Sequence, residues 1–272
     1  MVELILQESR KIVRVFNNTI ITETQHGFIC ANSGIDQSNV SKSKNLVLLL
    51  PRDPDKSANT IRKGIYKKTR KNIAVLITDT FGRPFRMGQT NIAIGIAGIK
   101  ALKNYKGKRD MFGKILKVTE IAIVDEIAGA AELVMGKTEG IPIAIVRNLT
   151  YPKSNSSIKK IIRKEIYKKT RKNIAVLITD TFGRPFRMGQ TNIAIGIAGI
   201  NPLKNYKGKR DMFGKIMKVT EIAIVDEIAG AAELVMGKTK GIPIAIVRNV
   251  TYSKSNSSIT KIIRKENKDI FR

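Results

Sequence analysis

Two aspartates stand where an apolar run gives way to a loop. Asp36 lies in the segment SGIDQSN and Asp79 in LITDTFG, and Asn39 and Thr80 stand close to them in the sequence. Carboxylate, hydroxyl and amide oxygens are the ligands that hard divalent cations prefer. The pattern therefore allows a metal site. The alternative is turn chemistry, because Asp and Asn also favour turns.

A Gly-Lys-Thr tripeptide at 136–138 resembles part of a phosphate-binding loop. The complete motif needs a glycine five residues before Gly136, where this chain has Ala131, and a strand before the loop. The sequence predicts a helix before it instead, so the motif is incomplete. We expect a helix C-terminus here, at which a Gly-flanked Lys and Thr can still contact phosphate.

Basic side chains follow the strand that carries Asp79. Arginine binds carboxylate and phosphate groups with two parallel hydrogen bonds, so a converging set would clamp an anionic substrate. The alternative is a solvated basic face, which is the simpler interpretation of the sequence. The residues are Arg83, Arg86, Lys106, Lys108 and Arg109.

An internal duplication dominates the organisation of the chain. Residues 65–165 recur at 166–266 with seven differences in 101 positions. A unit of this size and identity indicates a tandem duplication rather than a solenoid, whose repeats are shorter and diverge. We therefore divide the chain into region 1–165 and a second copy with a short tail, 166–272.

The duplication also explains the charge. The chain has 272 residues and a net charge of +28, which by itself suggests a polyanionic partner. Each copy carries +12, so much of the excess is one basic segment counted twice. The sequence contains no zinc finger, zipper or RNA-binding signature, and we expect no specific nucleic-acid partner.

Other functional classes are excluded by composition. A single cysteine rules out a disulfide framework and fits a reducing compartment, so we expect a cytoplasmic protein. No apolar run approaches the roughly 18 residues of a membrane span, and we expect no membrane partner.

The hydrophobic pattern predicts an α+β fold in which mixed sheets are flanked by helices and functional loops follow strand ends. Strands are expected at 12–16, 19–23, 27–31, 46–50, 72–78, 91–99 and 141–147. Helices are expected at 2–10 and in the basic tail after 157. A third helix is expected to begin at a cap, Asp55 or Ser57, and to end at about Thr69. A fourth is expected over about 120–135, with Thr119 as its cap.

Several strings occur in an order typical of one family. They are FICANSGIDQSNV, LLLPRDPDKSA, VLITDTFGRPFRMG, IAIGIAGIKALKNYKGKRDMFGK, VDEIAGAAELVMG and GIPIAIVRN. Together they resemble the coenzyme F420:L-glutamate ligase (gamma-glutamyl ligase) family, over residues 1 to about 150, and the second copy repeats the later part. Relative to the family, region 1–165 lacks an N-terminal part.

The resemblance implies a GTP-dependent acid–amino-acid ligase of F420 biosynthesis. GTP would phosphorylate the terminal carboxylate of the F420 precursor, and the amine of L-glutamate would attack the acyl phosphate, with Mn or Mg neutralising the phosphates. The alternatives are an inactive remnant that retains nucleotide or cofactor binding on the same scaffold, and a basic polyanion-binding protein.

The resemblance also implies roles for individual residues. Metal would be held by Asp36, Asp79 and Thr80, and GTP would contact Asn39 and the loop Met135, Gly136, Lys137, Thr138, Glu139, Gly140 and Ile141. Lys137 departs from the acidic or amide residue frequent at its position, and an ammonium cannot coordinate a cation. The second-copy equivalents are Asp180, Thr181 and Lys238. No catalytic residue is assigned.

The family implies dimers with intertwined protomers. The duplication then leaves two arrangements open for this chain. It forms a homodimer, or the second copy occupies the partner's place as an internal pseudo-dimer. An unpaired duplicate would expose apolar strands and edges.

Overall fold

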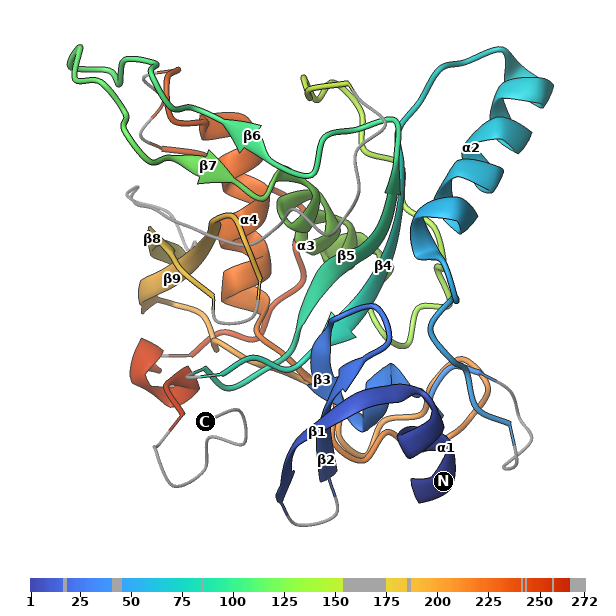
Figure 1. The fold of residues 1–272 in the computed structure, drawn as a ribbon. Coiled ribbons are helices and arrows are strands. Elements are labelled where there is room, and N and C mark those ends of the chain that lie inside the picture. Colours follow the sequence, from blue (N-terminus) through green and yellow to red (C-terminus); the bar gives the residue numbers. More distant parts are fainter. Residues whose placement is uncertain are drawn as a thin grey trace.

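The computed structural model describes residues 1–16, 19–40, 46–84, 86–153, 175–184, 187–240, 242, 244–255 and 257–264. Within these ranges the chain is an α+β protein built from small antiparallel sheets and helices, as predicted (Figure 1). The predicted domain boundary at 165/166 and the basic helical tail of the first copy lie outside the described residues.

The N-terminal part pairs a short helix with a three-stranded sheet. Helix α1 (Val2–Gln7) precedes β1 (Ser9–Phe16), β2 (Thr19–Thr24) and β3 (Ile29–Ala31), which lie in that order in an antiparallel sheet. The alternating and β-branched residues in these segments predicted all three strands. A 3-10 turn, η1 (Asn32–Gly34), follows β3 and leads into the Asp36 loop.

Helix α2 (Pro54–Thr69) ends at the predicted residue but is capped by a different one. The side chain of Asp53 accepts a hydrogen bond from the Lys56 N–H at 2.8 Å. Asp55, one of the two predicted caps, instead accepts from the Ile96 N–H at 2.8 Å and ties the helix to a strand. The absence of a side chain at Gly95 permits this approach, because a Cβ there would overlap the backbone of Pro54.

Asp53→Ala is expected to destabilise the chain by about 1 kcal/mol, because one N–H at the start of α2 loses its acceptor. Urea unfolding monitored by circular dichroism measures the change. Unaltered stability would show that solvent satisfies that N–H equally well.

Strands β4 (Val75–Phe81) and β5 (Thr90–Ala97) form the hairpin at the centre of the first copy. Helix α3 (Ile123–Met135) packs on β5, and its buried face joins the main hydrophobic core. The sequence predicted both strands, as apolar runs of about the observed length. Asp79 and Thr80 sit next to each other near the end of β4, so they point to opposite faces of the hairpin.

Three sequence predictions in this region are wrong. Helix α3 begins at Ile123 without a side-chain cap, and the predicted cap region forms β7 (Glu120–Ile121), which pairs with β6 (Lys103–Asn104). The segment 46–50 makes a single bridge, Leu48 with Asp36, and Leu48 is 60 % exposed. The segment 141–147 forms no strand, and its large apolar side chains are exposed.

The second copy repeats the elements of the first. It contains β8 (Val176–Phe182), β9 (Thr191–Ala198), β10 (Lys204–Asn205), β11 (Glu221–Ile222) and α4 (Ile224–Met236), followed by the turn η3 (Ile259–Ile262). The identical sequences explain the matching elements.

The two copies pack against each other with reciprocal contacts. Helix α3 lies against α4, as Figure 1 shows at the centre of the molecule. Gln89 of the first copy forms a parallel bridge with Ile222 of the second, and Gln190 of the second forms the same bridge with Ile121 of the first. Each of these two bridges is the counterpart of the other with the copies exchanged. Such an exchange is the pattern of a twofold interface, here within one chain.

Buried ion pairs follow the same exchange. Asp226 on α4 binds Arg83 and Arg86 of the first copy, at 2.7 and 2.8 Å. Asp125 on α3 binds Arg184 and Arg187 of the second copy. The prediction of a solvated basic face is therefore wrong for Arg83 and Arg86, whose side chains are only 11 and 15 % exposed.

A pair of buried glutamates occupies the crossing of α3 and α4. Glu126 packs over Gly230, and Glu227 packs over Gly129. Each accepts a hydrogen bond from a backbone N–H of the opposite copy, at 2.9 and 2.8 Å. Burial, followed by the repulsion of Glu132, raises the pKa of Glu227 to about 8. Burial and the repulsion of Glu233 raise the pKa of Glu126 well above its ordinary value.

These raised pKa values predict a pH dependence of stability. Between an unfolded pKa of about 4.5 and the folded value of about 8, Glu227 holds a proton that unfolding releases. Stability therefore falls as the pH rises through this window, by about 1.4 kcal/mol per pH unit for this carboxyl. Glu227→Gln is expected to reduce the slope by that amount in urea unfolding at pH 5, 6 and 7. An unchanged slope would contradict the prediction.

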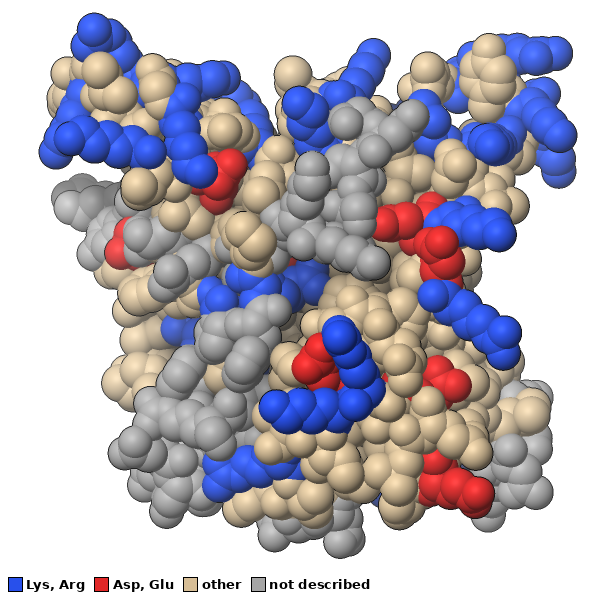
Figure 2. All heavy atoms as spheres, viewed as in Figure 1, with Lys and Arg blue, Asp and Glu red and all other residues tan. Residues whose placement is uncertain are grey.

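Basic side chains gather at one end of the molecule. Figure 2 shows lysines and arginines over the β6–β7 hairpin and over α2, with few acidic residues among them. In the part of the chain that the structure describes, no helix is long and apolar enough to cross a membrane.

Candidate functional site

The two predicted metal-binding aspartates lie near enough for the charge of Asp36 to act on Asp79. Asp79 is near the end of β4, and Asp36 is in the loop after η1. Burial, together with the like charge of Asp36, raises the pKa of Asp79 to about 6, although the Thr80 N–H and Lys137 act in the opposite direction. The Asp36 loop is held in place by a backbone bridge to Leu48 and by the Ser38 N–H and hydroxyl, which both donate to Asp36 at 2.8 Å.

Thr80 points to the other face, into a network with Lys137. The ammonium of Lys137 donates to the Thr80 hydroxyl, which donates to Asn91 on β5 at 2.9 Å. Asn91 donates in turn to Glu132 on α3, whose carboxylate lies 3.6 Å from the Lys137 ammonium. A lysine charge thus sits between the strand end and the C-terminal part of α3.

The second copy contains the same network except for the link from the threonine hydroxyl to the asparagine, because the side-chain oxygen of Asn192 has no hydrogen-bond partner among the described residues. Lys238 donates to the Thr181 hydroxyl at 2.7 Å and lies 3.5 Å from Glu233, to which Asn192 donates at 2.7 Å. Asp180 occupies on β8 the position of Asp79 on β4. The Asp36 loop lies outside the duplicated segment, so the sequence supplies one complete pair of aspartates.

The Gly-Lys-Thr loop ends a helix, as predicted. Gly136 is the C-cap of α3, its φ is +59°, and its N–H donates to the Glu132 carbonyl at 3.0 Å. A side chain there would collide with Glu139, whose carboxylate also accepts from the Thr138 N–H at 2.8 Å. The remaining members of the loop are Met135, which ends the helix, Gly140, whose φ is +65°, and Ile141, which is 42 % exposed.

Asn39 connects this loop to the Asp36 loop and to the second copy. Its side-chain N–H donates to the Lys137 carbonyl at 3.1 Å. Its backbone N–H donates to Asp211 at 2.5 Å, and its side-chain oxygen accepts from the Met212 N–H at 2.9 Å. The hairpin of the second copy that carries Asp211 therefore covers the Asp36 loop.

The equivalent hairpin of the first copy has no such loop to cover. Phe112 at its tip is 86 % exposed, whereas Phe213 at the same position of the second hairpin is partly buried. The two hairpins differ by a single residue between 103 and 121, Leu116 against Met217. The difference in burial therefore comes from their surroundings rather than from their sequence.

The aspartates fit a divalent cation better than Thr80 does. The partly buried carboxylate of Asp79 and the exposed carboxylate of Asp36 repel each other, and they are a suitable donor pair because a cation would relieve the repulsion. In the described ranges no group of three His, Cys, Asp or Glu side chains is placed to hold a metal. The Thr80 hydroxyl is already engaged by Lys137 and Asn91, so Thr80 stays a prediction from sequence alone.

Comparison with known proteins gives the family. The model of the family described as F420-0:gamma-glutamyl ligase matches residues 1–148 and then residues 149–249. The chain belongs to this family. The second match covers most of the second copy, in accord with a duplicated ligase segment.

Individual members of the gamma-glutamyl ligase family show the same similarity. A coenzyme F420:L-glutamate ligase of Methanococcus maripaludis strain C7 is 51 % identical over 165 residues, which are 60 % of this chain and 65 % of that protein. Those of Methanocaldococcus jannaschii and Methanothermobacter thermautotrophicus are 51 % and 46 % identical, over 60 % of this chain and 64 % and 65 % of their own lengths. The chain thus spans just under two thirds of these relatives.

Sequence reasoning missed three members of this ligase-family site. Asn91 and Glu132 complete the Thr80–Lys137 network, and Asp211 holds Asn39 from the second copy. The hairpin register sets Thr80 opposite Asn91, but a register shift between Ile77 and Thr78 means that the two apolar runs alone do not define this pairing. No sequence signal links Asn39 with Asp211, which is 172 residues away.

Proposed function

We propose that this chain forms a gamma-glutamyl amide bond between L-glutamate and the precursor of coenzyme F420, with GTP as co-substrate and Mn or Mg as the cation. The observation that carries the proposal is the meeting of the Asp36–Asp79 pair with the Lys137 loop through Asn39. These are the segments that the family resemblance assigns to metal and nucleotide.

Different residues of the site would bind the cation, bind GTP and supply a positive charge. Asp36 and Asp79 would hold the cation, which when bound neutralises phosphate charge and helps to orient the phosphates. The loop of residues 136–140 would position GTP, and Asn39 would hold that loop in place through its hydrogen bond to the Lys137 carbonyl. Lys137 would add a fixed positive charge beside Thr80, where an acidic residue would bring a further metal ligand.

The reaction then balances in two steps. A carboxylate oxygen of the precursor attacks the γ-phosphorus of GTP, and GDP leaves with the electrons of the broken P–O bond. The neutral amine of glutamate attacks the acyl carbon, phosphate leaves, and the amine loses a proton as the amide forms.

A ligation assay tests the proposal. The full chain is incubated with the F420 precursor, L-glutamate, Mn and GTP, and the products are analysed by mass spectrometry and by release of phosphate. We expect a product heavier by one glutamyl residue together with one GDP, and little product without metal or with ATP in place of GTP. GTP binding without product would favour the inactive, nucleotide-binding alternative.

A second candidate function rests on the surface charge. The basic end formed by α2 and the β6–β7 hairpin is suited to a polyanion (Figure 2). If it contacts 6–10 phosphates of DNA, affinity should fall about 10³–10⁵-fold between 50 and 200 mM salt. Weak binding with a shallow salt dependence would remove this candidate.

A further inference from the structure

Polar side chains of the first copy contact one another in a closed polar ring. The ammonium of Lys137 donates to the Thr80 hydroxyl, which donates to the side-chain oxygen of Asn91 at 2.9 Å. The side-chain N–H of Asn91 donates to Glu132, and that carboxylate lies 3.6 Å from the Lys137 ammonium. The polar ring therefore joins β4, β5, α3 and the loop that follows α3.

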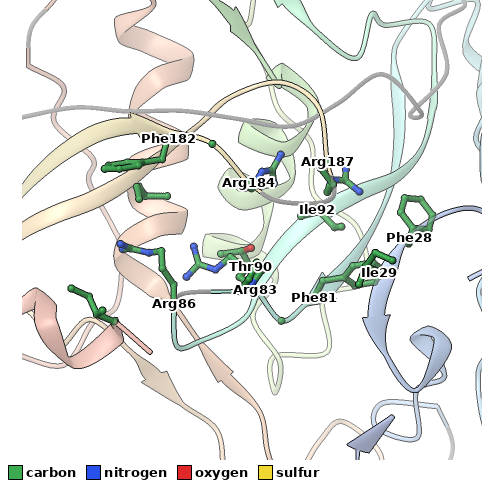
Figure 3. A pocket seen from close by; sticks show the side chains of 15 residues that line it. Phe28, Ile29, Phe81, Arg83, Arg86, Thr90, Ile92, Phe182, Arg184 and Arg187 are labelled. Carbon is green, nitrogen blue, oxygen red and sulfur yellow. The ribbon is translucent and has the colours of Figure 1, made fainter. Parts of the chain in front are cut away.

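The polar ring lies apart from the cavity between the two copies. Figure 3 shows Thr90 and Ile92 among the side chains that line this cavity, together with four arginines. Asn91 stands between these two residues on β5, and successive side chains of a strand point to opposite faces. Asn91 therefore points away from the cavity, and the members of the polar ring are not among the residues that line it.

Asn91 is the member that closes the polar ring. Its amide accepts from Thr80 and donates to Glu132, and a carboxylate in its place could not donate. Asn91 is only 4 % exposed, so these contacts are shielded from solvent. Its backbone N–H donates to Glu227 on α4 at 2.8 Å. The second copy thus holds the strand in place while the side chain of Asn91 links Thr80 to Glu132.

The polar ring fixes the position of a flexible charge. A lysine side chain has many rotamers, and its ammonium stays at one point only when several partners hold it there. Lys137 is held at both ends, because Asn39 donates to its carbonyl at 3.1 Å and Thr80 accepts from its ammonium. An ammonium has three N–H donors, so the contacts with Thr80 and Glu132 leave one for a phosphate oxygen.

The second copy offers a comparison, because its equivalent ring is open. Lys238 donates to the Thr181 hydroxyl and Asn192 donates to Glu233, each at 2.7 Å. The side-chain oxygen of Asn192, however, meets no donor in the part of the chain that the structure describes. The residue types are the same in both copies. The polar ring is thus closed in the copy beside the Asp36 loop and open in the other.

We propose that Asn91 is a positioning residue for Lys137: by closing the polar ring, it keeps the ammonium where it meets a phosphate of the bound nucleotide. This inference rests on the proposed function, in which Lys137 adds a fixed charge beside Thr80. A fixed donor binds phosphate more tightly than a mobile one, because the donor does not have to be ordered when the nucleotide binds. Asn91 itself does not touch the nucleotide and acts through Lys137 and Thr80.

The reactivity of the Lys137 amine tests the positioning without any nucleotide. The full chain is treated with a trace of acetic anhydride, and the acetylated fraction of each lysine is measured by mass spectrometry. The peptides of Lys137 and Lys238 are resolved because position 139 is Glu and position 240 is Lys. Asn91→Ala is expected to raise the labelling rate of Lys137 at least about fivefold and to leave that of Lys238 unchanged, because only the first ammonium loses its fixed partners.

Asn192→Ala is the matched control. It removes an asparagine that is 2 % exposed, and whose backbone N–H donates to Glu126 at 2.9 Å, from the same position of the second copy. We expect unchanged labelling of Lys137 and a similar midpoint of urea unfolding. Asn91→Leu keeps the branched shape of the side chain without its hydrogen-bonding groups and carries the same expectation as Asn91→Ala. Labelling of Lys137 as slow as in the wild type, or an equal rise in Asn192→Ala, would overturn the proposal.

A double substitution restores the polar ring with donor and acceptor exchanged. In Asn91→Asp/Glu132→Gln the new carboxylate accepts from Thr80 and from the new amide, so the number of contacts and the net charge are kept. We expect labelling of Lys137 within about twofold of the wild type, because the ammonium regains fixed partners. Labelling as fast as in Asn91→Ala would contradict the assignment.

Nucleotide affinity tests the link to the proposed function. Binding of GDP with Mn is measured by titration calorimetry, and KM and kcat for GTP are measured in the ligation assay. We expect Asn91→Ala to weaken GDP binding and to raise KM at least about fivefold, with kcat within about threefold, because the phosphate contact is made before and during the reaction. Faster labelling of Lys137 with unchanged affinity for GDP would overturn the proposal. A wild-type chain that binds no GDP would overturn the proposed function instead, and the positioning of Lys137 by Asn91 would stand.

Discussion

Asp79→Asn is expected to lower glutamate ligation by at least about a hundredfold. The substitution keeps the size of the side chain and removes the negative charge of Asp79. The proposed cation therefore loses one of its two carboxylate ligands and keeps only that of Asp36. In metal-dependent phosphoryl transfer, positioning and charge neutralisation supply most of the rate. The ligation assay with GTP and Mn measures the loss.

The chain supplies a matched control for this substitution. Asp180→Asn changes the same residue in the same local sequence, but on the strand that has no Asp36 loop beside it. It is expected to retain activity within about threefold. Both variants should unfold at similar urea concentrations. Equal loss of activity in the two variants would show that the effect is structural and would contradict the assignment of the site to the first copy.

The second large effect is expected at the interface between the copies. Asp125→Ala should destabilise the chain by about 3–5 kcal/mol, because it leaves Arg184 and Arg187 buried without a counter-charge. The Ala93 N–H also loses its acceptor, now at 2.9 Å. Although burial alone raises the pKa of Asp125, the two arginines hold that pKa below its ordinary value, so the pair is ionised in the folded chain.

An exposed ion pair provides the comparison. Glu120 binds Lys106 at 2.6 Å, but their side chains are 29 and 46 % exposed, and Glu120→Ala is expected to cost at most about 1 kcal/mol. Urea unfolding of both variants measures the difference. If Asp125→Ala costs no more than Glu120→Ala, the two copies do not depend on this ion pair for their association.

The local structure of each copy was largely predictable. The runs that became β4 and β5 are apolar and bounded by polar loops, and the helix that became α3 has an apolar face of helical spacing. Sequence motifs suggested Asn39 as a cation ligand and the Lys137 loop as a phosphate contact, and the family resemblance made both of them predicted GTP contacts. Spacing alone left Asp36 and Asp79 as either metal ligands or turn residues.

The exposed segments and the contacts between copies were not predictable. Residues 46–50 and 141–147 are as apolar as true strands, but the described chain offers them no sheet edge to extend. The sequence around Arg83 is typical of a surface residue. Its buried ion-pair partner, Asp226, lies 143 positions later in the chain, so the sequence does not reveal the pair. Periodicity reports which residues are buried along one element and contains no information on the element they face.

The number of hairpins in this chain differs from the number of loops that they can cover. Each chain contains two copies of the hairpin, at 103–121 and 204–222, and one loop at 35–39 for a hairpin to cover. In any assembly made only of these chains, hairpins therefore outnumber loops two to one. However many chains associate, and whichever hairpin is used, one apolar tip per chain is left without a loop of this kind.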